Sequence, residues 1–289
     1  MDFSERLDQA WSLHAEAPDQ VAQTLKDLFE ILNSEDEAIA FLELSVHVIG
    51  GHQGRWEEAG SWVNKLAQHQ LGSSQQLIRA IEIKRQAIAL ASGLAAGREG
   101  EAANTPDDAY IQARAEAADL LAEQDRCSEA KDLLREIDLE LLPDSDRSTA
   151  LAVAMSSNNL AWKLLESGDL SDSLDLAQLS LCAWSVAGGW IEVERAHYLI
   201  SKCHAALGRG EDAVKSAEEC LSICELHGAT LDELFYASEG VALAYAAAGQ
   251  KIGFYEFRAR ARKIFDQLQV GNQAMCGDAM QNLDNQKFV

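Results

Sequence analysis

Residues 157–184 read SNNLAWKLLESGDLSDSLDLAQLSLCAW, and this stretch decides the fold class. Leu160, Ala161, Leu164 and Leu165 recur at helical spacing, which predicts one apolar helix face. Gly168 ends that helix, a short polar turn follows, and residues from 174 onward begin a second apolar face. The stretch therefore predicts an antiparallel helical hairpin, whose two faces need neighbouring hairpins to be buried.

The turn of this hairpin recurs along the chain. Gly168 aligns with Asp125, Gly208 and Gly249, which lie 43, 40 and 41 residues apart in sequence order, and more distantly with Gly54. Five positions after these turn residues a small residue recurs, namely Ala59, Ala130, Ser173 and Ala213, while the last unit has Phe254 instead. A small residue at this place lets the two helices of a hairpin approach closely, so the pattern predicts a repeat of about forty residues.

Two of these units resemble the tetratricopeptide repeat. NNLAWKLLESGDLSDSLDLAQLSL and AHYLISKCHAALGRGEDAVKSAEECL match its small–large spacing through both helices. The long period resembles the variants in kinesin light chains, MalT-type bacterial regulators and Rap-like regulators. This resemblance implies an all-α fold, a right-handed α-α superhelix of antiparallel hairpins.

The predicted solenoid spans residues 1–268. Its clearest repeats cover 108–268, and glycines, Asn104 and Pro106 predict a break at 96–107. Ser34, followed by Glu37, predicts the start of a helix that ends at Gly50-Gly51. Residues 269–289 lose the period and are expected to form a tail or a capping helix, in which Met275, Met280, Leu283 and Phe288 cover the last hairpin.

Charge and composition narrow the classes of partner. The formal net charge is −23, which disfavours direct binding of nucleic acids and of anionic membranes and favours a basic or mixed-charge protein partner. The alternative interpretation is that this negative charge only keeps the protein soluble. No secretory signal or membrane-spanning run is recognisable, so we expect a cytoplasmic protein of unassigned oligomeric state.

The sequence contains no motif of a known enzyme class, and we expect no catalytic residue, cofactor or metal. Cys220, Cys224 and His227 share one helix face and suggest zinc, but a fourth ligand is lacking. The alternative is that both cysteines are apolar core residues and that the helix dipole favours a histidine such as His227 near the helix C-terminus.

The resemblance implies that the first helix of each hairpin lines a concave groove, where asparagines can clamp a peptide backbone. The candidate groove residues are Asn158, Asn159, Trp162, Arg195, Tyr198, Lys202, Tyr236 and Glu239. Asn158 and Asn159 resemble the asparagine pair of kinesin light chains, although they can equally bond an adjacent helix. Trp162 can equally pack between repeats.

The leading functional hypothesis is a non-enzymatic adaptor that binds a protein or peptide. A regulatory solenoid that senses a small effector or signalling peptide is the alternative, and an enzyme on a helical scaffold is a remote one.

Overall fold

The computed structural model describes residues 2–71, 74–93, 107–137 and 145–286. Its elements are all helices, and no strand occurs in these ranges, so the all-α prediction is confirmed. Among the described residues, none of the helices has the combined length and apolarity that crossing a membrane requires. The helices are α1 (Phe3–Leu13), α2 (Pro18–Glu30), α3 (Glu35–Val46), the π-helix η1 (His47–His52), α4 (Trp56–Ala67), α5 (Gln75–Ser92), α6 (Asp107–Glu123), α7 (Cys127–Arg135), α8 (Arg147–Ser167), α9 (Leu170–Ala187), α10 (Trp190–Ala206), α11 (Gly210–His227), α12 (Leu231–Ala247), α13 (Lys251–Phe265) and α14 (Val270–Asn285).

The five turn residues aligned by sequence all adopt the left-handed backbone conformation. Gly54, Gly168, Gly208 and Gly249 have φ angles of 63°, 89°, 72° and 70°, and Asp125 has a φ of 57°. Glycine adopts this region without a Cβ penalty, and aspartate is among the residues that tolerate it best. The repeat read from the sequence is therefore a repeat of backbone geometry.

The close approach of paired helices is also confirmed. The residues five positions after the turns, Ala59, Ala130, Ser173, Ala213 and Phe254, are all fully buried. In two hairpins a serine hydroxyl donates across the contact: Ser173 to the Ala161 carbonyl at 2.7 Å, and Ser201 to the Ala213 carbonyl at 2.9 Å. A buried serine at such a place satisfies its polar atom while it keeps the helices close.

Backbone contacts divide the described chain into two compact units, with a boundary at Ser156 and Ser157 within α8. Unit 1 contains α1–α7 and the first part of α8; unit 2 contains the rest of α8 and α9–α14. The prediction of one continuous solenoid over 1–268 stays a prediction, and most of the predicted break at 96–107 lies outside the described residues.

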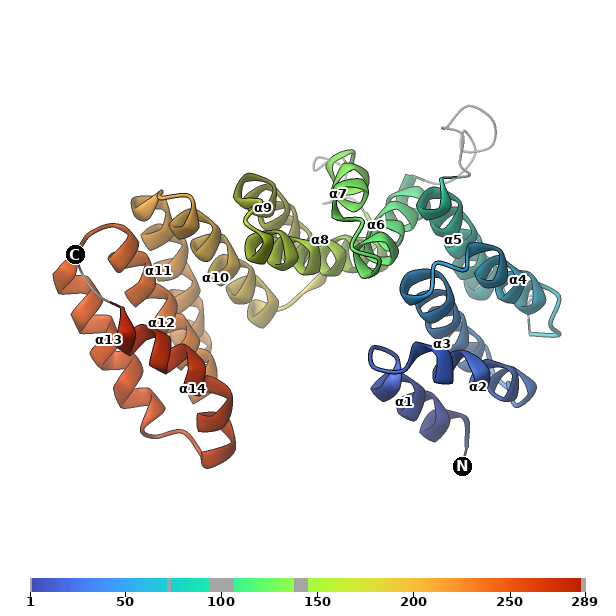
Figure 1. Ribbon diagram of the computed structural model, residues 1–289, viewed down its shortest axis with the longest axis horizontal. Helices are drawn as coiled ribbons and strands as arrows, with labels where there is room; N and C mark the ends of the chain where they lie inside the picture. Colours follow the sequence, from blue (N-terminus) through green and yellow to red (C-terminus); the bar gives the residue numbers. More distant parts are fainter. Residues whose placement is uncertain (1, 72–73, 94–106, 138–144, 287–289) are drawn as a thin grey trace. The chain divides into compact units, whose positions relative to one another are not determined.

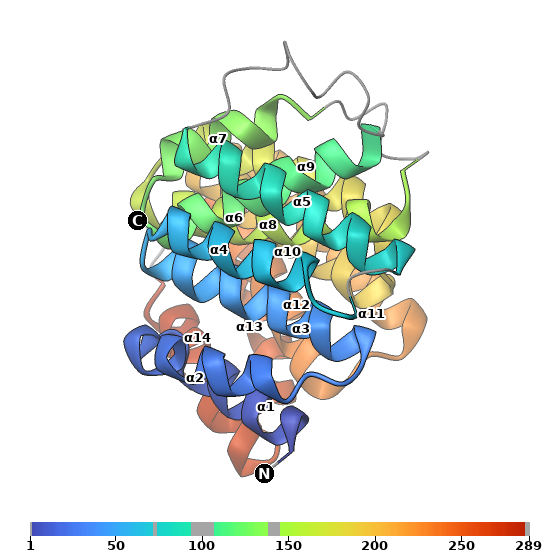
Figure 2. The same ribbon diagram turned by 90° about the vertical axis from the view of Figure 1, so that its right-hand side faces the viewer.

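In unit 1, consecutive helices pack against one another from α1 to α7, and Figure 2 shows α3, α4 and α5 in successive layers. A buried charge cluster joins three of these helices: Lys84 of α5 pairs with Glu43 of α3 and with Glu116 of α6, the latter at 2.9 Å. Burial alone lowers the pKa of Lys84, but the two carboxylates outweigh it and the net shift is upward. This lysine is therefore charged and fully paired.

Helix α3 ends earlier than its sequence predicts. The α-helical hydrogen bonds stop at Val46, and residues 47–52 form the π-helix η1. The predicted start is confirmed, because the Ser34 hydroxyl accepts the backbone N–H of Glu37. The widened turn is held from outside the helix: the Gln124 side chain, which follows α6, donates to the Gly50 carbonyl at 2.6 Å.

In unit 2, hairpins α10–α11 and α12–α13 follow one another, and α14 packs against α12 and α13 (Figure 1). The end of the unit has a core around Phe235 and Phe254, to which α14 contributes Cys276, Met280 and Leu283. Met275 is exposed, and Phe288 lies outside the described residues. Helix α14 thus covers the apolar surface that the last hairpin would otherwise leave open.

Candidate functional site

Five of the eight residues predicted to line a groove meet at one cavity of unit 2. The cavity has a volume of about 370 Å³ and lies between side chains of α8, α10, α12 and α14. Its walls are formed by Asn158, Trp162, Glu194, Arg195, Tyr198, Asp232, Glu233, Tyr236 and Met275. The first helix of each hairpin provides most of this lining.

An aromatic row runs along the cavity. The ring centroids of Trp162 and Tyr198 are 6.3 Å apart, and those of Tyr198 and Tyr236 are 6.4 Å apart. Each tyrosine hydroxyl is held: Tyr198 donates to Glu239 at 2.9 Å, and Tyr236 donates to the Met275 carbonyl at 3.3 Å. Fixed aromatic rings lose little side-chain entropy when a partner binds, which suits a binding surface.

Glu239 lies beneath this row and not on its surface. Its side chain is buried, and it contacts the Tyr198 hydroxyl and Lys202, whose Nζ is 3.6 Å from the carboxylate. Burial raises the pKa of Glu239 and that of Tyr198, while Lys202 opposes the shift at Glu239. Glu239 therefore positions Tyr198, and Gly240 leaves room for its ring, because a Cβ there would lie 3.0 Å from it.

Lys202 belongs to a second cavity further along the same helices. This cavity also has a volume of about 370 Å³ and is bordered by Leu165, Lys202, Gly240, Leu243 and Gln286, among others. The Lys202 Nζ stands 4.9 Å from the Tyr198 ring centroid, so Lys202 connects the two cavities by a cation–π contact.

The asparagine pair has one member at the cavity. Asn158 is half-buried and lines the wall, whereas Asn159 is exposed and lies outside the lining. The Asn158 Nδ2 lies 3.5 Å from the Asn159 Oδ1, a long contact that leaves the amide of Asn158 available to a ligand.

Arg195 is exposed at the rim and pairs with Glu233 of the next hairpin, and its Nε is also 3.8 Å from Glu194. Glu194 is 3% exposed, and its Oε2 accepts a hydrogen bond from the Cys220 thiol at 3.1 Å. Burial, followed by the neighbouring Glu233, raises the pKa of Glu194 to about 9, so its carboxyl group is protonated at neutral pH. The cavity charge then comes from Arg195, Asp232 and Glu233.

The cysteine–histidine group is divided by the structure. Cys220 and Cys224 are buried and face Glu194, with one ligand atom of each residue within 4.8 Å of the others. His227 lies elsewhere, stacked on Trp190 with ring centroids 5.1 Å apart. The three residues predicted as possible ligands therefore do not converge on one point.

The raised pKa of Glu194 predicts how the stability of unit 2 depends on pH. Unit 2 is expected to lose stability as the pH rises from about 4.3 to about 9, because the folded carboxyl keeps a proton that the unfolded chain loses. Glu194→Gln stays neutral and can still accept from Cys220, so it should flatten this dependence. Urea unfolding of both proteins across that pH range measures the effect, and parallel pH profiles would rule it out.

Four lining residues, Glu194, Asp232, Glu233 and Met275, were not predicted from the sequence. Three of them lie on first helices, about one turn before the tyrosine of the same helix, and their helical phase could have identified them. Met275 comes from α14, which lies outside the repeat period.

Comparison with known proteins gives matches among solved structures alone. No protein-family model matches the chain, and no curated protein matches it. Among solved structures, the TPR-like repeats of a putative kinesin light chain from Podosopora anserina align over 79% of this chain and 95% of theirs, with 15% identity and a TM-score of 0.48. A Rap protein complexed with competence and sporulation factor aligns over 97% of this chain and 87% of its own, with 13% identity and a TM-score of 0.39.

The predicted fold type is confirmed by the chain's own geometry. Antiparallel hairpins with left-handed turn residues and buried small contacts recur through the described residues, so the chain has a TPR-like helical repeat fold. The handedness of the predicted superhelix stays a prediction.

Proposed function

We propose that unit 2 is a non-catalytic binding module that holds an extended segment of a protein partner across its first helices. The observation that supports this most strongly is the convergence of Asn158, Trp162, Arg195, Tyr198 and Tyr236 on one cavity. Tryptophan, tyrosine and arginine are the side chains most enriched among energetic anchors of protein interfaces.

Each type of side chain has a distinct role in this proposal. The rings of Trp162, Tyr198 and Tyr236 offer apolar faces to partner side chains. The Asn158 amide can donate to one backbone group of the partner and accept from another, which holds an extended chain without reading its sequence.

The charges favour a basic segment. With Glu194 protonated, the two carboxylates Asp232 and Glu233 outnumber Arg195 in the cavity. A lysine or arginine of the partner can compete with Arg195 for Glu233 while its stem lies over an aromatic ring. The net charge of −23 would speed the approach of such a segment at low salt.

A displayed library of random extended peptides, selected on the full chain, tests the proposal. Selected peptides should be enriched in lysine and arginine. The double variant Asn158→Ala/Asn159→Ala should bind them roughly tenfold more weakly, which corresponds to a loss of about 1.4 kcal/mol of binding free energy. Asn159→Ala alone is the matched control and should have little effect. If the double variant binds every selected peptide as tightly as the unaltered chain, the asparagine pair is not part of the site.

A further inference from the structure

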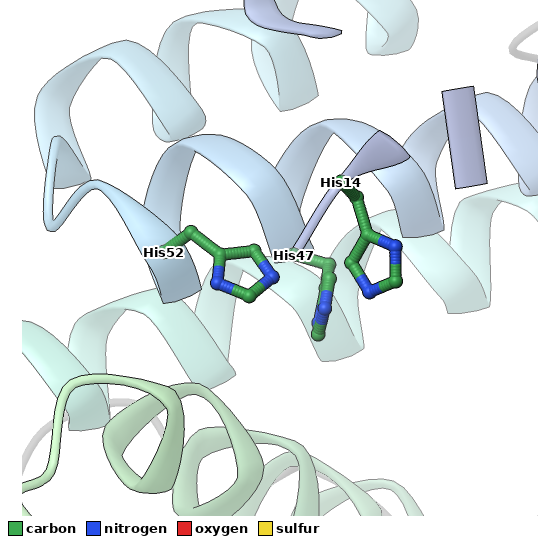
Figure 3. A group of neighbouring side chains, drawn as sticks. All are labelled: His14, His47 and His52. Atoms are coloured by element: carbon green, nitrogen blue, oxygen red, sulfur yellow. The ribbon is translucent and has the colours of Figure 1, made fainter. Parts of the chain in front are cut away.

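Three histidines lie together in unit 1, far in sequence from the cavity described above. His14 caps the C-terminal end of α1, and His47 and His52 are the first and last residues of η1. Their ring centroids are 5.1 Å (His14–His47), 5.3 Å (His14–His52) and 4.8 Å (His47–His52) apart. Figure 3 shows the three rings gathered in one place, and one ligand atom from each lies within 4.8 Å of the others.

The π-helix is what brings two of these rings together. In an α-helix, residues five apart point about 140° away from each other, because each residue turns the helix by about 100°. A π-helix closes i→i+5 hydrogen bonds, so His47 and His52 lie on the same side of η1 in successive turns, with their rings edge to face. Packing fixes this geometry: Gln124 binds the Gly50 carbonyl, and a Cβ on Gly50 would lie 2.9 Å from the Trp56 ring.

The ring nitrogens are arranged for a ligand. His14 donates its Nδ1–H to the Trp11 carbonyl, which leaves the Nε2 lone pair of the neutral ring free. The His52 Nδ1 faces Glu123 at 3.5 Å. The Nε2 atoms of His47 and His52 are buried and have no hydrogen-bond partner within the described part of the chain.

Burial disfavours the charged form of His47 and of His52. Burial lowers the pKa of His47 to about 3, and His52, His14 and Lys84 act in the same direction. Burial also lowers the pKa of His52, against the opposing influence of Glu123. The buried Nε2 atoms of His47 and His52 still lack a hydrogen-bond partner among the described residues, and a buried polar atom needs one.

We propose that His14, His47 and His52 form a binding site for a zinc-class divalent metal ion. Imidazole is a preferred ligand of Zn²⁺, and three histidines with a water in the fourth position form a known type of open zinc site. Zn–N bonds of about 2.0–2.1 Å place ligand nitrogens about 3.3 Å apart. Small rotations of the three side chains would close the present spacing to that value.

The groups that contact the other nitrogens of two of these rings support the same assignment. Histidine ligands usually donate their other ring nitrogen to a carboxylate or a backbone carbonyl, which fixes ring orientation. Glu123 stands in this relation to His52, and the Trp11 carbonyl stands in it to His14. A bound ion would join the end of α1 to η1 and make the stability of the first hairpin depend on metal.

The competing interpretation is that the rings only pack. Trp11 lies 5.1 Å from His14 and 5.4 Å from His47 between ring centroids, and such an aromatic cluster is stabilising without any ion. Packing alone predicts no response to metal, which separates the two interpretations.

Calorimetric titration of the chelator-treated full chain with Zn²⁺ tests the proposal. One equivalent of Zn²⁺ should bind saturably. Each of the variants His14→Gln, His47→Gln and His52→Gln should lower the affinity for that ion by more than the roughly 10- to 100-fold that is lost when a group hydrogen-bonded to a ligand histidine is removed. The loss of Zn²⁺ affinity in Glu123→Gln should be within that roughly 10- to 100-fold range. Cys224→Ser and His227→Ala are the matched controls. Both should still bind one equivalent of Zn²⁺ with unchanged affinity, because neither residue belongs to the histidine cluster.

Two further readouts remain decisive if a histidine variant fails to fold. At a saturating excess of about 100 Kd, Zn²⁺ should raise the Tm of the unaltered chain by roughly 5–10 °C. Co²⁺ should give visible absorption of a four-coordinate site without a sulfur-to-metal band. A sulfur-to-metal band, no saturable equivalent, or an equivalent unchanged in folded histidine variants would overturn the proposal.

Discussion

Gly210→Ala is expected to lower the free energy of unfolding of unit 2 by about 3 kcal/mol, at the upper end of what overpacking costs. Gly210 begins α11, and a Cβ there would lie 2.4 Å from the Ala248 Cα and 2.6 Å from its nitrogen. These are backbone atoms at the end of α12, so no side-chain rotation relieves the clash. The start of α11 would have to move away from α12.

Gly277→Ala is the matched control. Gly277 lies within α14, and nothing stands within 4 Å of the place its Cβ would take. Alanine should therefore stabilise this helix by about 0.5–1 kcal/mol. Urea unfolding at 25 °C compares the two variants, and a shift of the same sign in both would contradict the packing argument.

Trp162→Ala is expected to weaken binding of a selected basic peptide by about 30-fold or more, which corresponds to the roughly 2 kcal/mol of an interface anchor. Trp162 is partly exposed, lines the cavity and stands next to Tyr198, so its loss removes one end of the aromatic row. Fluorescence anisotropy of a labelled peptide measures the change.

Tyr255→Ala is the corresponding control for Trp162. Tyr255 is 54% exposed on α13 and is not part of either cavity of unit 2. Its removal should leave the affinity within about twofold, the range of near-neutral contacts. Equal losses in the two variants would show that the peptide binds elsewhere or that the selection was not specific.

The repeat could be predicted from the sequence because its signals are local. Gly168, Gly208 and Gly249 each combine a left-handed turn with a buried contact five residues later, and both features fall within one short window. The same period places Trp162, Tyr198 and Tyr236 on the first helices of successive hairpins, and neighbouring rings of this set lie 6.3 and 6.4 Å apart between centroids.

The π-helix and its histidines could not be predicted in this way. The hydrogen bond from Gln124 to Gly50 joins residues 74 positions apart, and the local pattern reads as an ordinary helix as far as Gly50. Because α-helical phase separates His47 from His52, only the altered turn brings them onto one side.

The sequence also could not predict which of the groove side chains are buried. Glu239 was predicted to line the groove, yet its carboxyl group is buried against the Tyr198 hydroxyl and Lys202 of the preceding hairpin. Whether a polar side chain at that position meets solvent depends on the size of its neighbour in the adjacent hairpin, which the repeat period does not specify.

The most direct measurement is a crystal structure of the full chain with one selected peptide. The peptide is expected to lie extended over the cavity of Trp162, Tyr198 and Tyr236, with a basic side chain near Asp232 or Glu233. Peptide bound on α9, α11 or α13, or on unit 1, would contradict it.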